Sequence, residues 1–369
     1  MSTDGRINTV SQKIAKRIIN ACMQVRAGER IHISSWGYTV NLASNMAIEC
    51  YTRGAVPLIT LLTDDLFERI VTEIPVETLA QTPTHELAIA DTIDGYIKIS
   101  GPADPTILER ASDDRYSAFA KAGGEIGKTY ERRNVRQLNV HLGKVTRKRA
   151  EHYRFSYSKW KNIMENALLV DYSALKRTGE HLMQQISSGE NVRVVTDHTD
   201  LKFRVGEDLR LDDGVVSKRD VADGNLLTNL PGGLLELFPQ EKSGEGVFTA
   251  DTLHRLGKTI KQARLQLEDG MVTSVTAERN VKPLHKVVDR VCTEQPVLNR
   301  VGIGLNPEMK RGYLFDELCR STVSIAIGSK TGKCVISWPL REPTLYVDGM
   351  KLIERGKIST HEFRSTHEF

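Results

Sequence analysis

The first half of the chain alternates between helical and strand-like hydrophobic patterns. Apolar side chains spaced three and four residues apart indicate helices, and short apolar runs between turn residues indicate strands. Proline lacks the amide hydrogen that a strand interior needs, so the strand near Pro57 is expected to begin after it. The pattern predicts helices near residues 10–25, 42–50 and 66–72 and strands at residues 30–34, 58–62 and 96–99. This order is typical of a parallel sheet with crossover helices.

From Ala167 onward the hydrophobic pattern changes, and strand-like apolar runs dominate. One helix is expected near residues 174–187, before the stop signal Ser188-Gly189. Strands that follow one another with few helices between them favour an α+β domain with a largely antiparallel sheet. We predict such strands at residues 192–196, 201–205, 265–267, 272–277, 323–327 and 345–347.

These two hydrophobic patterns and the chain length indicate two domains. A chain of 369 residues is longer than one hydrophobic core usually serves. We therefore predict an α/β plus α+β protein, with an N-terminal open α/β domain and a basic linker at residues 1–165. The second domain is expected at residues 166–358, followed by a tail at residues 359–369.

Composition describes an ordinary globular protein, with 40% hydrophobic and 27% charged residues. Its apolar runs have strand length and are too short to cross a bilayer, and the N-terminus lacks the pattern of a secretory signal. The five cysteines are odd in number and form no CxxC pair. Reduced thiols in the cytoplasm are therefore expected, rather than a disulfide frame or a structural zinc.

Positive charge is concentrated between Glu131 and Asn162. Ten Lys or Arg against two acids give this block a net charge of +8, so the rest of the chain carries −4 of the total +4. Aromatic residues lie among the cations, which is a composition that can neutralise and stack on nucleic acid. The alternative is a linker helix with a solvated basic face and aromatic residues packed on a neighbour.

The stretch from Asn229 to Ala250 has the composition of a site loop. Pro231, Gly232 and Gly233 follow an acidic, turn-rich run, and such clusters let the backbone approach other groups closely. The chain carries no dinucleotide-binding fingerprint, so we expect no nucleotide cofactor. The function depends on whether this loop still presents a catalytic carboxylate.

Seven short segments occur in a recognisable order along the chain: Arg26-Ala27-Gly28-Glu29-Arg30-Ile31, Arg53-Gly54-Ala55, Asn229-Leu230-Pro231-Gly232-Gly233, Val247-Phe248-Thr249-Ala250, Gly302-Ile303-Gly304-Leu305-Asn306-Pro307, Ser324-Ile325-Ala326-Ile327-Gly328 and Val347-Asp348-Gly349. In them the sequence resembles the thermophilic-type metalloaminopeptidases, the aminopeptidase T and S family. The resemblance implies a C-terminal domain of the aminopeptidase T/S type and a homodimer. It also implies two divalent metal ions that activate a water and polarise a carbonyl.

The resemblance also shows where the metal ligands of that family belong. A first ligand Glu is replaced by Leu234, unless an insertion has displaced it to Glu245. A second Glu is replaced by Arg300 and a His by Ser324. The positions of a final His-x-Asp hold Ser337 and Pro339, or Val335 and Ser337 in a shifted match. Carboxylate or imidazole is therefore missing from at least three positions, and we predict a divergent member that binds no metal.

Other residues are candidates for a replacement site. Glu236, Glu241, Asp251 and His254 are possible displaced ligands, although surface carboxylates and a structural histidine are the simpler interpretation. The candidates for substrate binding are Arg300, Arg320, Glu236 and Glu245, since an arginine can bind a carboxylate or phosphate bidentately. Weak candidates for a nucleophile are Ser324, Ser337 and Cys334, each of which would need a base within hydrogen-bond reach.

Three functions remain possible from the sequence. The first is a metal-independent enzyme that acts on an anionic or amino-acid-like small molecule. The second is a pseudoenzyme that binds a ligand or a macromolecular partner, with the basic block of residues 131–162 as its candidate surface. The third is a metalloaminopeptidase with displaced ligands such as Glu245.

Overall fold

The structure is a computed structural model that describes residues 9–110, 112–255, 258–282, 284–285, 288, 295–329 and 335–359. The chain forms two compact units. Unit 1 contains the chain up to Tyr172 together with Gly214–Gly232, and unit 2 contains Ser173–Asp213 and the chain from Gly233 onward. Across the described residues, none of the helices has the length and apolar character needed to cross a membrane.

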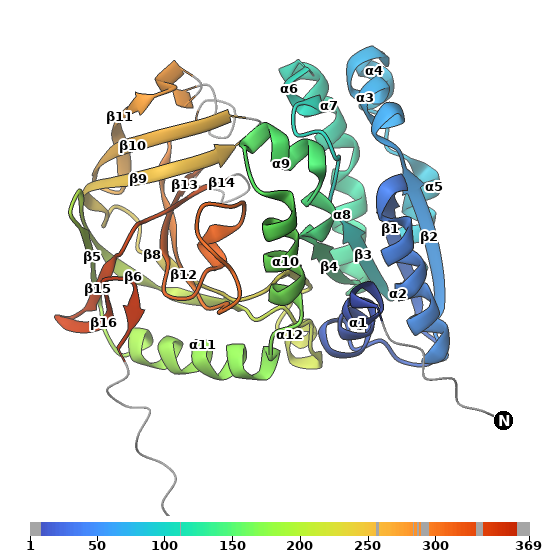
Figure 1. The fold of residues 1–369 in the computed structure, drawn as a ribbon, viewed down its shortest axis with the longest axis horizontal. Coiled ribbons are helices and arrows are strands. Elements are labelled where there is room, and N and C mark those ends of the chain that lie inside the picture. Colours follow the sequence, from blue (N-terminus) through green and yellow to red (C-terminus); the bar gives the residue numbers. More distant parts are fainter. Residues whose placement is uncertain are drawn as a thin grey trace, which may run out of the picture. The chain divides into compact units, whose positions relative to one another are not determined.

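Unit 1 is built on a five-stranded sheet in the order β2-β1-β3-β4-β7 (Figure 1). Every neighbouring pair of strands is parallel. The strands are β1 (Arg30–Trp36), β2 (Val56–Leu62), β3 (Gly95–Ile99), β4 (Arg136–Val140) and β7 (Leu227–Leu230). The sheet has two free edges, β2 and β7, so the expected open α/β architecture is confirmed.

Helices connect these strands because parallel neighbours require crossover connections. The first helix begins at a capping box, in which the Thr9 side chain accepts a hydrogen bond from the Gln12 amide at 3.3 Å. The helices are α1 (Val10–Arg17), the π-helix η1 (Ile18–Cys22), η2 (Gly37–Thr39), α2 (Val40–Thr52), α3 (Asp64–Glu73), α4 (Val76–Leu79), α5 (Thr84–Ala90), α6 (Ile107–Arg110), α7 (Asp113–Ala122), α8 (Gly124–Arg133), η3 (His141–Lys144), α9 (Arg147–Tyr153), α10 (Tyr157–Leu168) and α12 (Lys218–Ala222).

Strand β2 begins earlier than its sequence indicates. It starts at Val56, so Pro57 lies inside the strand as the register partner of Ile31. Since β2 is an edge strand, the missing amide of Pro57 removes no hydrogen bond from a second neighbour. The expected start after Pro57 was therefore wrong by two residues.

The basic block is part of the fold of unit 1 and includes a central strand. Strand β4 runs through it, and the buried Arg136 side chain pairs with Glu29 at 2.6 Å. Arg149 is also buried and donates to the Pro102 carbonyl at 2.6 Å. Trp160 is fully buried, which agrees with aromatic residues packed on a neighbour. A nucleic-acid surface in this block stays a prediction.

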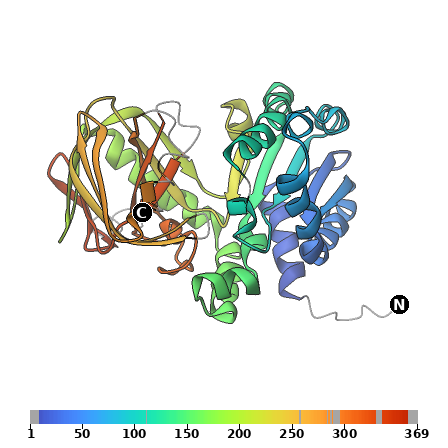
Figure 2. The ribbon, with the colours of Figure 1, turned by 90° about the horizontal axis from the view of Figure 1, so that it is seen from above.

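Unit 2 is built on a twelve-stranded sheet that closes on itself. Strand β8 pairs with both β12 and β6, so β12, β11, β10, β9, β6 and β8 form a closed ring of antiparallel neighbours (Figure 2). Strands β13 and β14 extend the sheet from β12, and β5, β15, β16 and β17 extend it from β6. The predicted domain with a largely antiparallel sheet is thus confirmed, with a closure that the hydrophobic pattern did not indicate.

The strands of unit 2 bury large apolar side chains. Phe248 and Trp338 are fully buried and contact each other with ring centroids 6.3 Å apart. The elements are α11 (Tyr172–Ser187), β5 (Asn191–Thr196), β6 (Thr199–Asp212), β8 (Leu234–Pro239), β9 (Glu245–Arg255), β10 (Lys258–Glu268), β11 (Met271–Arg279), β12 (Val297–Gly304), the 3-10 helix η4 (Asp316–Leu318), β13 (Val323–Gly328), β14 (Val335–Pro339), β15 (Thr344–Val347), β16 (Met350–Glu354) and β17 (Lys357–Ile358).

Candidate functional site

The sequence positions that the family resemblance assigns to metal ligands lie together in unit 2. Pro339 pairs with Ser324 across β14 and β13, and Ser324 pairs with Gly302 of β12. Gly302 in turn pairs with Glu236 of β8. Directly paired residues point to the same side of a sheet, and so do residues two apart in one strand. We call the surface formed by Leu234, Arg300, Ser324, Ser337 and Pro339 the ligand-position face.

Leu234, rather than Glu245, belongs to this face. Leu234 follows the glycines of the site loop and pairs with Gly304 of β12. A Cβ atom on Gly302 would lie 2.6 Å from the Ser324 hydroxyl and 3.0 Å from a Leu234 methyl, so only glycine leaves room for both. Glu245 lies instead at the start of β9, where its carboxylate accepts a hydrogen bond from the Asp269 amide at 2.8 Å.

An internal ion pair occupies the ligand-position face. Glu236 and Arg300 form a salt bridge in which the two side chains are 7% and 27% exposed. Burial raises the pKa of the Glu236 carboxyl, while the Arg300 charge opposes that shift. The buried carboxylate and the arginine therefore satisfy each other.

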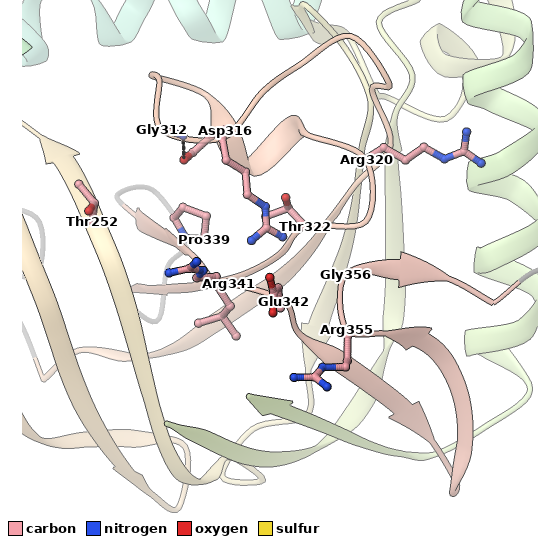
Figure 3. A pocket seen from close by; sticks show the side chains of 12 residues that line it. Thr252, Gly312, Asp316, Arg320, Thr322, Pro339, Arg341, Glu342, Arg355 and Gly356 are labelled. Carbon is pink, nitrogen blue, oxygen red and sulfur yellow. Dashed lines mark hydrogen bonds between the residues drawn. The ribbon is translucent and has the colours of Figure 1, made fainter. Parts of the chain in front are cut away.

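An arginine-rich pocket of about 410 Å³ begins where this face ends, at Pro339 (Figure 3). It is lined by segments that precede β13, follow β14 and join β16 to β17. No ion pair or side-chain hydrogen bond joins its four guanidinium groups to any residue in the described part of the chain. We call this the arginine pocket; its lining residues are Thr252, Arg311, Gly312, Asp316, Arg320, Thr322, Pro339, Leu340, Arg341, Glu342, Arg355 and Gly356.

Two of its charged residues are held in an unusual backbone conformation. Arg355 has a φ of 43° and Glu342 a φ of 46°, in the left-handed region that side chains with a Cβ rarely adopt. Local hydrogen bonds hold these turns, since the Arg355 amide donates to the Thr344 hydroxyl at 3.1 Å. Backbone strain of this kind is concentrated at functional sites in proteins, and here it sets the positions of two charged side chains.

Asp316 is the titratable group of the pocket with the largest shift. Burial and the neighbouring charge of Glu317 raise the pKa of Asp316 to about 7, against the Arg311 charge and a hydrogen bond from the Gly312 amide at 3.1 Å. Figure 3 shows Asp316 with Glu342, Arg341 and Arg355 around the pocket, whereas the Arg320 side chain extends away from them.

A family profile matches most of the chain. The sequence profile of the thermophilic metalloprotease (M29) family matches residues 8–337. The chain belongs to the thermophilic metalloprotease family. No curated protein sequence matches it.

Two solved structures share the fold of this family member. One is wild-type AmpT from Thermus thermophilus, which is 18% identical with a TM-score of 0.73, over 95% of this chain and 98% of that chain. The other is 2,5-dihydroxypyridine dioxygenase from Pseudomonas putida KT2440, which is 13% identical with a TM-score of 0.63, over 95% and 97% of the two chains. At these identities the likeness concerns the fold alone.

The residues at the ligand-position face do not fit the two divalent ions that the family name implies. Such ions need carboxylate or imidazole ligands, and Leu234, Ser324 and Pro339 offer neither. Glu236 is engaged by Arg300, whose own charge repels a cation. In the described part of the chain, no group of three or more His, Cys, Asp or Glu side chains could hold a metal. His254 bonds to the Thr259 hydroxyl at 3.0 Å.

The predicted nucleophiles are not accompanied by a base. Ser324 is 2% exposed and Ser337 is half-buried, and neither hydroxyl is hydrogen-bonded to another residue among those the structure describes. Cys334 lies outside the described residues, as do the side chain of Asp251 and the residues from 360 onward.

Sequence reasoning found Arg320 but missed most of the arginine pocket. Arg311, Arg341, Arg355, Asp316 and Glu342 come from three separate segments that only the folded chain brings together. No spacing rule connects them. The one local signal was the density of charged and turn residues between β12 and β13 and around Glu342.

Proposed function

We propose that this protein binds an anionic, amino-acid-like small molecule in the arginine pocket and acts on it without a metal cofactor. The observation that carries the proposal is that four arginines are among the residues lining one pocket, and none of them has an ion-pair partner among the described residues. A guanidinium binds a carboxylate through two parallel hydrogen bonds. A bound anion would balance the excess of positive charge in the pocket, whose lining has four arginines and two acidic residues.

The acidic side chains of the pocket extend the proposal to amino-acid-like ligands. Asp316 and Glu342 line the same pocket as Arg341 and Arg355. A carboxylate accepts hydrogen bonds from an ammonium group, and a guanidinium donates them to a carboxylate. A molecule with both groups therefore matches the pocket better than a simple anion.

Asp316 would supply the chemistry. Since its pKa is about 7, it is partly protonated near neutral pH and can take a proton from a bound substrate or give one to it. The proposed reaction class is a proton transfer at the bound molecule. A fold shared by AmpT and a dioxygenase is compatible with chemistries other than peptide hydrolysis.

A pseudoenzyme that only binds its ligand or a macromolecular partner is the second candidate. It is favoured by the Glu236–Arg300 ion pair, which fills the ligand-position face with a satisfied structural contact. A metalloaminopeptidase with displaced ligands is the third, and Glu245 was its strongest residue. The predicted cytoplasmic location and homodimer accompany any of the three.

Ligand-induced stabilisation tests the binding proposal. The melting temperature is measured with α-amino acids, dicarboxylates and simple amines in the presence of a chelator. A ligand that binds the folded state alone stabilises it in proportion to ln(1 + [L]/Kd). Amino-acid-like anions should raise the melting temperature of the wild type, and Arg355→Gln should reduce their affinity about tenfold or more, the effect of losing one charge-assisted hydrogen bond.

Arg264→Gln is the matched control, because Arg264 is exposed on β10 and lies outside the pocket. Equal affinities for Arg355→Gln and Arg264→Gln would overturn the binding site. If a ligand is found, Asp316→Asn separates the first two candidates: loss of turnover with retained binding supports the enzyme. Two bound metals together with aminopeptidase turnover in cobalt or zinc would instead establish the third candidate.

A further inference from the structure

One face of the parallel sheet of unit 1 carries a row of polar side chains that crosses all five strands. Thr60, Ser34, Lys98, Asn139 and Asn229 are register partners in turn, from β2 to β7. Parallel sheets are usually covered on both faces and are apolar on both. Most side chains of the other face are apolar, such as Ile33, Ile97 and Leu138, so the polar row marks one face as different.

Lys98 stands at the centre of this row without a partner of opposite charge. It makes no ion pair and no side-chain hydrogen bond within the described chain. Arg136, one strand away in β4, shows the contrasting case, since Glu29 neutralises it at 2.6 Å. A lysine on a central strand without a counter-charge is a candidate for binding an anion.

A hydrogen-bonded cluster adjoins Lys98 at the carboxyl end of the sheet. Ser100 and His141 directly follow β3 and β4, and their Oγ and Nδ1 atoms are 3.3 Å apart. The Asn229 side chain also bonds to His141, and the Asn139 amide donates to the Asn229 carbonyl oxygen at 3.3 Å. In open α/β sheets, ligands bind outside the carboxyl ends of the strands, where this cluster lies.

Both charges that act on the pKa of His141 are positive. Burial and the Lys144 charge lower the pKa of His141 well below its usual range; the Asn229 hydrogen bond raises it and the Lys98 charge lowers it further. Two lysines thus lie near a neutral imidazole, and no carboxylate contributes to the shift. Such a site attracts a multiply charged anion.

The crevice that this strand order usually provides is closed. An order of the type 2-1-3-4-5 places its switch point between β1 and β3. A Cβ atom on Gly101 would lie 2.5 Å from the Trp36 ring, and the Tyr38 hydroxyl donates to the Gly143 carbonyl at 2.9 Å. Aromatic side chains therefore fill the switch point, and the polar cluster lies further along, over β3, β4 and β7.

We infer that Lys98, Lys144, Ser100 and Asn139 form a second binding site, for the phosphate group of a small molecule. Lysine ammonium groups act as compact point charges on phosphate, and hydroxyl and amide groups add hydrogen bonds to its oxygens. The cluster contains no arginine fork of the kind that matches a planar carboxylate. This site is separate from the arginine pocket and does not depend on the function proposed there.

Residue-resolved lysine labelling tests the site. The full chain is treated with an amine-reactive reagent, and the labelling rate of each lysine is measured by mass spectrometry with and without inorganic phosphate. Phosphate should slow the labelling of Lys98 about tenfold at a concentration ten times its Kd, by mass action. Lys159, an exposed lysine of α10, should keep its rate. An unchanged Lys98 rate would overturn the inference.

Variants separate this site from the arginine pocket. Protection of Lys98 should persist in Arg355→Gln and should be lost or weakened at least fivefold in Ser100→Ala. Equal protection in wild type and Ser100→Ala would leave only a diffuse positive surface, which contradicts the proposed site. Acetate that protects Lys98 as well as phosphate does would overturn the assignment to phosphate.

Discussion

The ligand-position face and the arginine pocket are neighbours in unit 2, yet their charges are balanced in opposite ways. In the ligand-position face, Arg300 lies against the nearly buried carboxylate of Glu236. In the arginine pocket, Arg341 and Arg355 have no such partner among the described residues. Both regions contain arginine, but of these arginines only Arg300 of the ligand-position face is paired with an acidic side chain among the described residues.

This difference shows which of the two regions has an unbalanced charge. Without Arg300 the buried Glu236 carboxylate would lack a counter-charge, and in the structure the two side chains pair. The ion pair therefore neutralises the buried carboxylate at the ligand-position face. The neighbouring pocket keeps an excess of positive charge, which is a property of a binding site rather than of a core.

Removing Arg300 should have the largest effect. Arg300→Leu leaves Glu236 buried and unpaired, and we expect the free energy of unfolding to fall by about 3 kcal/mol, as for a broken buried pair. Chemical denaturation at pH 7 measures the change. The double variant Arg300→Leu, Glu236→Leu should recover most of the loss, because it removes the buried charge as well. A loss below about 1 kcal/mol in the single variant would mean that the pair is solvated.

The sequence predicts those features of the two regions that depend on residues close together in the chain. Arg300 was found because a neighbouring glycine motif fixed its position, and the structure places it in the same sheet as Ser324 and Glu236. Its partner was not predicted, since the Glu236 carboxylate is sixty-four residues away in sequence. Hydrophobic periodicity within one strand does not show which residue of another strand will pair with it.

The helices and strands of the fold were also predictable only where neighbouring residues carry a regular pattern. Apolar periodicity located β1, β2 and β3 and the helices α1, α2 and α3, because their core positions recur regularly. Strand β4 escaped notice because Arg136, Gln137 and Asn139 interrupt its apolar residues. Unit 1 uses two of them, Arg136 for a buried ion pair and Asn139 for the polar row. Hydrophobic periodicity therefore failed to predict a strand in which charged and polar residues interrupt the apolar positions.

The second prediction concerns the pH dependence of the arginine pocket. In the folded protein the pKa of Asp316 is about 7, above its value of 3.8 in the unfolded chain. The folded state therefore holds the proton more tightly, and this stability is fully present below pH 4 and is lost as the pH rises to 7. Asp316 should contribute a fall of up to about 1.4 kcal/mol per pH unit in that window.

Denaturation of wild type and Asp316→Asn at several pH values isolates this contribution. The difference between the two free energies of unfolding should change across pH 4–7 and stay constant above it. Parallel curves for the two proteins would show that Asp316 titrates normally and would remove it as an acid–base group. Substitutions in the ligand-position face should leave this contribution of Asp316 to the free energy of unfolding unchanged, because Asp316 lies outside that face.

The third prediction sharpens the choice between Leu234 and Glu245. Glu245 accepts a hydrogen bond from the Asp269 amide and lies away from the ligand-position face. Glu245→Gln should therefore lower the free energy of unfolding by about 1 kcal/mol or less, the usual contribution of one hydrogen bond. Metal content, measured by elemental analysis after incubation with zinc, should be equal in variant and wild type. A loss of bound zinc in the variant would return Glu245 to the list of ligands.

The smallest predicted effect is an increase in stability, whereas the substitutions of Arg300 and Glu245 should lower it. Arg341→Gln removes one of four like charges that outnumber the two acidic residues of the pocket, so it should raise the free energy of unfolding by up to about 0.5 kcal/mol at low salt. Salt at about 1 M shortens the screening length to about 3 Å and should abolish the gain. Arg264→Gln, which removes an exposed arginine outside the pocket, is the control. A destabilising Arg341→Gln would mean that Arg341 is paired as Arg300 is, and the contrast between the two regions would then fail.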